Sequence, residues 1–305
     1  MHAKHRSCRL ASAALLSALA AGLLASSPAT ADTVVVADPT AQNVTAYGAT
    51  TAWSRRAADG RHRLVVSNAS GVAADAAVRS SSVPFDPDLG PTRRNGRVVV
   101  YSRCAKGSTT RGCDVYRYDV GSRSERRITA ISGRRTSEIG PSYFKGTLAF
   151  GRTGRHGGLF VTRAGRGAQR IVSGSVVETD LSMTRVIARM TRADRTFVRV
   201  SQPSGERARI VGRGLRGEDG LGTVVTSPVL ARYRAFWLKR IVAPGAASAI
   251  VETVSVRSAG RNVRRVARPF AGEVNAVALG PASVPQLFSG AGGISRVDPP
   301  LVIPV

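Results

Sequence analysis

Acidic residues are scarce in this sequence, and about half of them lie in a few connecting segments. Lysine and arginine number 45 against 19 aspartates and glutamates, which gives a formal net charge of +26. The acids recur in polar connectors between apolar stretches: Asp38, Asp86 and Asp88, Glu138, Glu178 and Asp180, Glu218 and Asp219, and Glu273. If a repeating fold brings its connectors together, these carboxylates form a loose acidic ring on one face of a basic molecule.

An acidic ring of this kind could bind a ligand in two ways. Carboxylate oxygens are the ligands that a hard cation such as Ca²⁺ prefers, and negative charge attracts a basic peptide. The candidate ligand-binding residues are Asp88, Glu138, Asp180, Glu218, Asp219 and Glu273. The alternative is that each acid only caps its own turn by accepting backbone N–H groups.

Patterns for catalysis and metal binding are weak. The sequence has no Gly-x-Ser-x-Gly elbow, and His62 and His156 are expected to be solvated turn residues, too few for a transition-metal site. Two acids of the connectors could act as the catalytic carboxylate pair of a glycosidase. However, few aromatic residues are available to stack on a sugar. We predict no catalytic residue, no metal site and no cofactor, with a Ca-type cation at the acidic ring left open.

Cys104 and Cys113 are close in sequence. In an oxidising compartment such a pair is expected to form a disulfide. The spacing is not that of a Cys-x-x-Cys redox motif, and no histidine lies nearby to complete a metal site. We therefore predict a structural disulfide.

The N-terminal segment has the features of a secretory signal peptide. A basic start is followed by an apolar run over 10–25 and by Ala29-Thr30-Ala31, a pattern typical of export. We predict a signal peptide over 1–31 and a single domain over 32–305, located in the periplasm, in the cell envelope or outside the cell. The apolar run is shorter than the roughly 20 residues of a membrane span, and no transmembrane segment is expected after cleavage. Export and the even spread of arginines argue against a nucleic-acid partner, while an anionic polymer is an alternative.

A short strand that ends in an aromatic or apolar residue, a small or apolar residue and then a basic residue recurs along the chain. Its copies are Trp53-Ser54-Arg55, Tyr101-Ser102-Arg103, Phe150-Gly151-Arg152, Ile187-Ala188-Arg189 and Trp237-Leu238-Lys239, with a degenerate copy at Gln286-Leu287-Phe288. After each copy come a turn and a second strand with alternating apolar residues. A third strand closes most units, and a fourth is placed before the recurring strand, for example over 44–47, 177–181 and 274–279.

Four strands repeated six times indicate an all-β fold, a six-bladed β-propeller with four-stranded antiparallel blades. A two-sheet β-sandwich is the alternative, because it also has short strands and regular turns. The fixed order of strands within each unit favours the propeller. Closing the ring requires an outer strand for the last blade, and 33–36 and 301–305 are the competing candidates.

Two units, over about 84–172, resemble the repeats of TolB-like (PD40, WD40-like) propellers. Those repeats run Asp-x-x-Pro, a turn with glycine, an apolar strand and then an (Leu/Ile)-Tyr-x-x-Asp strand. Here 88–91 reads Asp-Leu-Gly-Pro, 98–101 reads Val-Val-Val-Tyr, and 138–141 repeats the start as Glu-Ile-Gly-Pro. The resemblance implies a propeller that binds other macromolecules.

Together these features predict a secreted, non-enzymatic TolB-like propeller that acts as a protein-binding or scaffold module in the cell envelope or outside the cell. Its partner is expected to be another envelope or extracellular protein, and the propeller itself is expected to be monomeric. The alternative is a carbohydrate- or peptide-active hydrolase or lyase that uses the acids of the ring.

Overall fold

Every regular element in the described part of the chain is a β-strand. The computed structural model describes residues 33–68, 70–133, 135–163, 166–215, 221–231, 234–243 and 246–256, and the strand segments 264–265, 270–271, 274–279, 285–289 and 293–296. The predicted signal peptide over 1–31 lies outside these residues. Among the described residues, no helix is long and apolar enough to cross a membrane.

The strands form antiparallel sheets, and five of the sheets are blades built from strands consecutive in sequence. Blade 1 is β2 (Ala41–Tyr47), β3 (Thr50–Arg56), β4 (His62–Ser67) and β5 (Ala73–Asp75); blade 2 is β6 (Asp88–Pro91), β7 (Arg97–Arg103), β8 (Asp114–Asp119) and β9 (Ser124–Arg127). Blade 3 is β10 (Glu138–Phe144), β11 (Thr147–Arg152), β12 (Gly158–Arg163) and β13 (Gln169–Ser173); blade 4 is β14 (Ser175–Leu181), β15 (Val186–Arg192), β16 (Arg195–Ser201) and β17 (Arg209–Leu215). Blade 5 is β18 (Gly222–Ala231), β19 (Arg234–Ala243), β20 (Ala246–Ser255), β21 (Arg264–Arg265) and β22 (Phe270–Ala271).

A closing sheet joins the two ends of this series. It contains β23 (Val274–Leu279), β24 (Pro285–Ser289), β25 (Gly293–Arg296) and, at its outer edge, β1 (Thr33–Val36). Thr33 pairs with Arg296 across β1 and β25. The candidate closing strand at 33–36 is therefore confirmed, and the competing candidate at 301–305 lies outside the described residues.

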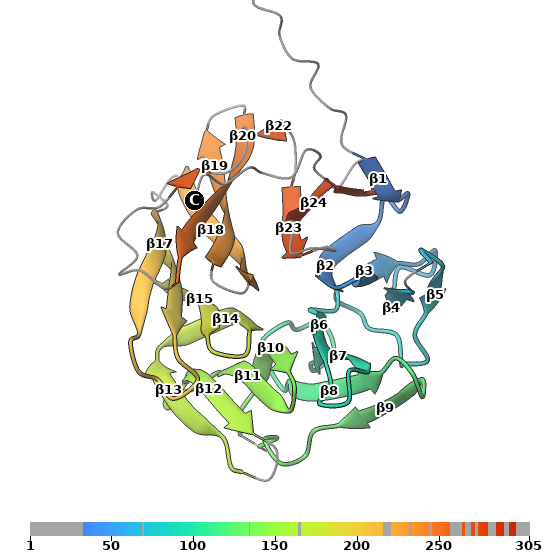
Figure 1. Ribbon diagram of the computed structural model, residues 1–305, viewed down its shortest axis with the longest axis horizontal. Coiled ribbons are helices and arrows are strands. Elements are labelled where there is room, and N and C mark those ends of the chain that lie inside the picture. The colour runs from blue at the N-terminus through green and yellow to red at the C-terminus, as the bar shows by residue number, and fades with distance from the viewer. Residues whose placement is uncertain are drawn as a thin grey trace, which may run out of the picture. The chain divides into compact units, whose positions relative to one another are not determined.

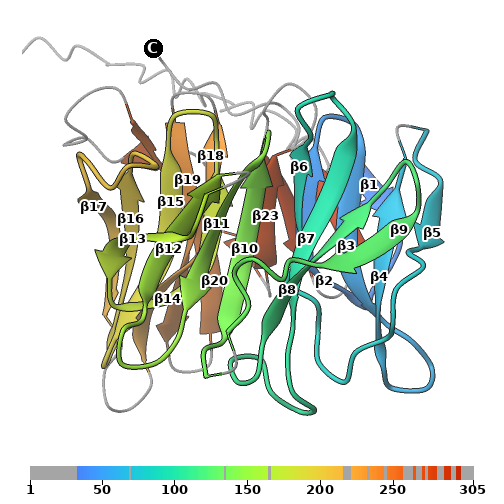
Figure 2. The same cartoon turned by 90° about the horizontal axis from the view of Figure 1, so that it is seen from below.

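The sheets follow one another around a central axis, and the first strand of each blade lies nearest to it (Figure 1). Figure 2 shows the same sheets from the side, as tilted neighbours packed face to face. The strands nearest the axis are β2, β6, β10, β14, β18 and β23, which we call the inner strands. The all-β propeller fold is thus confirmed.

The prediction of six four-stranded blades is wrong. The structure has five blades of consecutive strands, one of them five-stranded, together with the closing sheet that β1 completes. In blade 5 the outer position is divided, because β21 pairs with Glu252 and Thr253 of β20 while β22 pairs with Ser248 and Ala249. The sequence puts Pro269 between β21 and β22, and proline has no N–H to donate to a continuous strand.

The recurring strand of the sequence becomes the second strand of each blade. Its large residue is buried in every blade, as Trp53, Tyr101, Phe150, Ile187 and Trp237 show. These side chains fill the space between neighbouring sheets. Leu64 of blade 1 packs with Val99 of blade 2, for example, and Val198 of blade 4 packs with Val225 of blade 5. Burial of apolar surface between sheets is the main favourable contribution to folding.

Candidate functional site

A cavity of about 890 Å³ lies along the inner strands. Its wall consists of residues 43–48, 83–84, 86–90, 139–141, 143–144, 177–184 and 227–230, with Ser102, Cys104, Thr109 and Thr110. We call this space the central cavity. It is within the size range of small-molecule sites.

The inner strands contain no lysine or arginine, although the chain has 45 of them. The next strand of each blade, from β3 to β19, carries at least one arginine. Acids are present on the inner strands, namely Asp88, Glu138, Glu178 and Asp180. The described residues that line the cavity therefore include the acids Asp86, Asp88, Glu178 and Asp180 and no basic side chain.

Asp86 lies just before β6 and connects three strands. Its Oδ1 accepts the Ser102 N–H at 2.7 Å, while Oδ2 accepts the Ser102 hydroxyl at 2.8 Å and the Gly140 N–H at 3.0 Å. Burial raises the pKa of Asp86 to about 6, against the opposing effect of these hydrogen bonds. The carboxylate thus ties blade 2 to the inner strand of blade 3.

Asp88 and Asp180 occupy corresponding places on β6 and β14. Asp88 Oδ2 accepts the Tyr143 N–H at 2.9 Å, and Asp180 Oδ2 accepts the Leu230 N–H at 2.5 Å. Burial, and then the charge of Asp180, raises the pKa of Asp88 to about 8. Burial raises the pKa of Asp180 to about 6. Neither carboxyl forms an ion pair within the described residues.

These contacts belong to a series that runs from blade to blade. The Thr45 hydroxyl of β2 accepts the Leu89 N–H of β6 at 3.1 Å, as Asp88 does for β10 and Asp180 for β18. Glu178 Oε2 likewise accepts the Ser227 N–H at 2.9 Å. From β2 to β6, from β6 to β10 and from β14 to β18, a polar side chain of one inner strand therefore accepts a backbone N–H of the next. Asp38 and Asp180 also accept N–H groups of their own segments, from Thr40 and Leu181, as the alternative expects. The partners of Asp88 and Glu178 belong instead to the neighbouring blade.

Bulges in the inner strands set the direction in which these polar side chains point. The ladder between β10 and β11 is irregular between Ile139 and Ser142, and Gly140 has a φ of +52°. Ser227 of β18 has a φ of +48° and lies in a similar irregularity. Because a bulge redirects the side chains that follow it, strand alternation does not carry across these positions.

The six predicted ligand-binding residues are placed differently. Asp88 and Asp180 both line the central cavity. Glu138 does not: its side chain is fully buried, and its Oε1 accepts Arg152 Nε at 3.0 Å and the Thr136 hydroxyl at 2.7 Å. The other three predicted residues lie outside the described part of the chain: Glu218, Asp219 and Glu273.

Several wall residues were not among the predicted site residues. They are Asn43, Thr45, Asp86, Ser102, Glu178 and Ser227. A signal for most of them exists in the sequence, as a pair of polar residues two positions apart within or just before an inner strand, seen in Asn43-x-Thr45, Asp86-x-Asp88 and Glu178-x-Asp180. Both members of each pair line the cavity.

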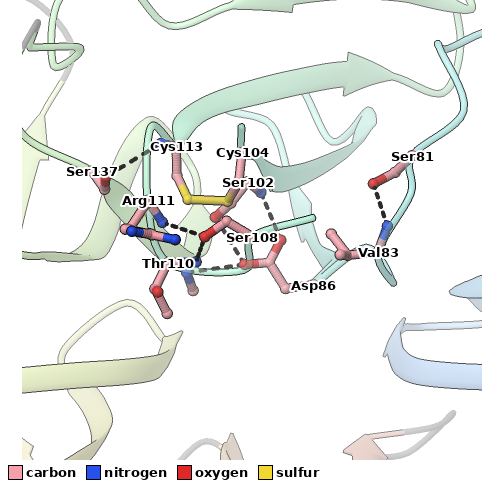
Figure 3. The surroundings of a disulfide bond; sticks show 11 residues. Ser81, Val83, Asp86, Ser102, Cys104, Ser108, Thr110, Arg111, Cys113 and Ser137 are labelled. Carbon is pink, nitrogen blue, oxygen red and sulfur yellow. Dashed lines mark hydrogen bonds between the residues drawn. A yellow bond between two sulfur atoms is a disulfide. The ribbon is translucent and has the colours of Figure 1, made fainter. Parts of the chain in front are cut away.

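The predicted disulfide between Cys104 and Cys113 is confirmed. Figure 3 shows it at the base of a loop beside Asp86 and Ser102. Within the loop the Ser108 hydroxyl accepts the Arg111 N–H at 2.9 Å, and beyond it the Cys113 N–H donates to Ser137 Oγ at 3.3 Å. Because Cys104, Thr109 and Thr110 line the cavity, the disulfide fixes part of its wall.

Other chemical groups give no further site. His156 is exposed, whereas the prediction of a solvated His62 is wrong, because His62 is 7% exposed and lies 3.4 Å from the Ser54 hydroxyl. Burial, and then the charge of Arg56, lowers the pKa of His62. Among the described residues, no group of three or more His, Cys, Asp or Glu could hold a metal ion.

No protein-family model matches the sequence, and no curated protein matches it. Solved structures of similar fold include TolB from Acinetobacter baumannii, with 12% identity and a TM-score of 0.46, over 73% of this chain and 53% of that chain. A puromycin-hydrolyzing peptidase of Mycobacterium tuberculosis has 14% identity and a TM-score of 0.51, over 88% of this chain and 46% of that one. A chain of the nidogen/laminin complex has 10% identity and a TM-score of 0.52, over 74% and 82%.

This chain therefore spans about half the length of the TolB and peptidase structures that it matches. At these identities the likeness concerns the fold. The sheet order shows that the chain is a β-propeller.

Proposed function

We propose that this protein is a non-enzymatic binding module whose central cavity receives a cationic segment of another protein, in the cell envelope or outside the cell. The observation that carries the proposal is the absence of lysine and arginine from every inner strand of a chain with a net charge of +26. Complementary charge gives specificity and speeds association. The disulfide supports a location outside the cytoplasm, where such bonds persist.

Binding is favoured over catalysis by the contacts of the acids. The oxygens of Asp180 accept the N–H groups of Leu181 and Leu230 and the Ser142 hydroxyl. Asp86 is held in the same manner by Ser102 and Gly140. Carboxylates with these contacts give the cavity a fixed shape and a negative wall, which a cationic group requires for recognition.

The second candidate is a hydrolase or lyase acting on a carbohydrate or a peptide. It is favoured by the different pKa values of Asp88 and Asp180, about 8 and about 6, because an acid and a base must differ in this way. Release of product from glycan or peptide substrates, lost in Asp88→Asn, would support this candidate against the first.

Peptide binding tests the proposed function. A fluorescein-labelled hexalysine peptide should bind the wild-type protein, and Asp86→Asn with Asp180→Asn should weaken that binding by about tenfold or more, which is roughly 1.4 kcal/mol. Each of these carboxylates accepts backbone N–H groups with both of its oxygens, and asparagine keeps only one of the two. Circular dichroism and urea unfolding of the double variant must therefore show that it is folded before its binding is compared. Asp119→Asn is the matched control, because Asp119 lies on β8 and outside the cavity wall.

A hexaglutamate peptide distinguishes binding in the central cavity from binding on the exterior of the protein. It should bind the arginine-rich exterior equally in the wild-type and in the double variant. If hexalysine does not bind, or binds both proteins equally, the cavity is not a site for cationic segments.

A further inference from the structure

Neighbouring inner strands run in the same direction around the axis. At β6 and β10, Asp86 contacts Gly140 and, further along both strands, Asp88 contacts Tyr143. The contacts between β14 and β18 follow the same order. The last residues of these strands therefore lie at the same end of the central cavity.

Three apolar side chains line the cavity at this end. Tyr47 is the last residue of β2, Phe144 is the last residue of β10, and Met183 lies in the turn that follows β14. The rings of Tyr47 and Phe144 meet edge to face, with their centroids 6.4 Å apart. Between their strands lies β6, which ends in Gly90 and Pro91, and neither has a long side chain to separate the rings. We call Tyr47, Phe144 and Met183 the apolar rim.

Met183 is the most exposed member of the apolar rim. It is 74% exposed, and of the four large apolar residues exposed in the described part of the chain, it alone lines the cavity. Phe144 packs against the apolar cluster that contains Leu181, two residues before Met183. Burial of exposed apolar surface is favourable, and a thioether makes favourable contacts with aromatic rings. The apolar rim therefore suits an apolar side chain, above all an aromatic one.

Cations behind the apolar rim disfavour a further cation at this end. Arg97 lies over the Tyr47 ring at 4.8 Å, and Lys145 lies over the Phe144 ring at 6.0 Å. The Arg97 guanidinium is held by its own turn, because it donates to the Asn95 carbonyl at 2.7 Å. A lysine of a ligand would add a third positive charge here and would be repelled. A neutral side chain would not be.

The acids of the wall lie deeper in the cavity than the apolar rim. Asp180 is three residues before Met183, so the two are at most about 11 Å apart along the chain. Glu178 lies two residues further toward the other end. An extended ligand advances about 3.3 Å per residue. It can therefore reach the acids and the apolar rim together if its apolar residue lies within about three positions of a cation.

We propose that the cationic segment received by the central cavity carries an apolar, preferentially aromatic, residue within three positions of its cations, and that the apolar rim binds this residue. This inference rests on the proposed function, because it specifies which cationic segments the cavity accepts. The acids attract the segment, and the apolar rim distinguishes it from other segments of the same charge.

Two peptides of equal charge and length test the proposal. Both are labelled with fluorescein and amidated at the C-terminus. One consists of four lysines, a glycine and a phenylalanine, and the other has a second glycine in place of the phenylalanine. The phenylalanine peptide should bind the wild-type protein about tenfold more tightly, because its ring is buried against the apolar rim.

A variant of Met183 shows whether this advantage comes from the apolar rim. Met183→Gln should reduce the advantage to about threefold or less and should leave binding of the glycine peptide within about twofold of the wild type. Leu215→Gln is the matched control, because Leu215 is 55% exposed on β17 of the same blade and lies outside the cavity wall. It should keep the full advantage.

NMR of methionine methyl groups labelled with ¹³C locates the bound ring. The Met183 signal should move upfield when the phenylalanine peptide binds, because an aromatic ring shields protons over its face, and should move much less with the glycine peptide. Met190 is 3% exposed and lies outside the cavity wall, so its signal is the internal reference.

The outcomes separate this inference from the proposed function. If the two peptides bind equally, or if the Met183 signal does not move while the phenylalanine peptide is bound, the inference is wrong and the proposed function stands. If neither peptide binds, both are wrong.

Discussion

Gly90 on β6 lies so close to Tyr143 on β10 that a Cβ atom at position 90 would be 1.8 Å from the Tyr143 carbonyl oxygen. Only glycine allows the two inner strands this approach. Gly90→Ala should therefore destabilise the protein by roughly 3 kcal/mol or more, because backbone must move. Urea unfolding measures the loss. Gly167→Ala is the control, since a Cβ there meets nothing within 4 Å, and equal stability of the two variants would contradict the close packing.

Stability should depend on pH through the cavity acids. A carboxyl whose pKa is raised by folding keeps its proton in the folded state after the unfolded chain has lost it at about pH 4. Its contribution to stability therefore falls as the pH rises above about 4. The fall ends near the pKa of the folded state, which is about 6 for Asp86 and Asp180 and about 8 for Asp88.

The window from pH 7 to pH 9 isolates Asp88, because it lies above the ordinary pKa of histidine, about 6.5, and folding lowers the pKa of His62 further. The free energy of unfolding should fall by about 1–2 kcal/mol across it, and Asp88→Asn should remove most of that fall. Urea denaturation at successive pH values checks this. A wild-type protein that gains stability over this window would show that the pKa of Asp88 is not raised by folding.

Loss of the disulfide should reduce stability without removing the fold. The bond closes a short loop, with a sequence separation of 9, and the chain-entropy estimate for a loop of this size is about 2–3 kcal/mol. Replacing both Cys104 and Cys113 by serine should lower the free energy of unfolding by that amount. Adding a reductant should lower the stability of the wild-type protein similarly and leave the double variant unchanged.

Glu138 should matter for stability and not for binding. It is fully buried and paired with Arg152, whose side chain is 20% exposed. Glu138→Gln should cost about 2–3 kcal/mol, because it leaves a partly buried guanidinium without its counter-charge. Hexalysine binding at a temperature where the variant is folded should stay within about twofold of the wild type. A loss equal to that of the Asp86 and Asp180 double variant would place Glu138 in the binding site.

The strands could be predicted because each carries its own pattern. The buried residue at Trp53 or Trp237 and the basic residue after it recur in every blade, since each blade packs against its neighbours in the same way. The divided outer position of blade 5 could not be predicted in this way. The spacing of Arg265 and Phe270 against Glu252 and Ala249 depends on pairing that no local pattern encodes.

The candidate site could be predicted only in part, because its contacts also join residues that are distant in sequence. Asp88 and Asp180 were predicted from their place in the connectors, but their partners Tyr143 and Leu230 are about 50 residues away in sequence. Glu138 has a similar place in the sequence, but the bulge between Ile139 and Ser142 separates it from the cavity wall. Strand alternation assumes a regular ladder, and at β10 the ladder is irregular.

The pairing of Thr33 with Arg296 also fixes the order in which the molecule can be completed during synthesis. Thr33 leaves the ribosome long before Arg296. Until β25 is made, β1 therefore has an unpaired edge, and such edges pair readily with other chains. Joining residues so distant in sequence is also slow. A chain that ends before β25 would leave β1 and β24 without this partner and would be prone to aggregate.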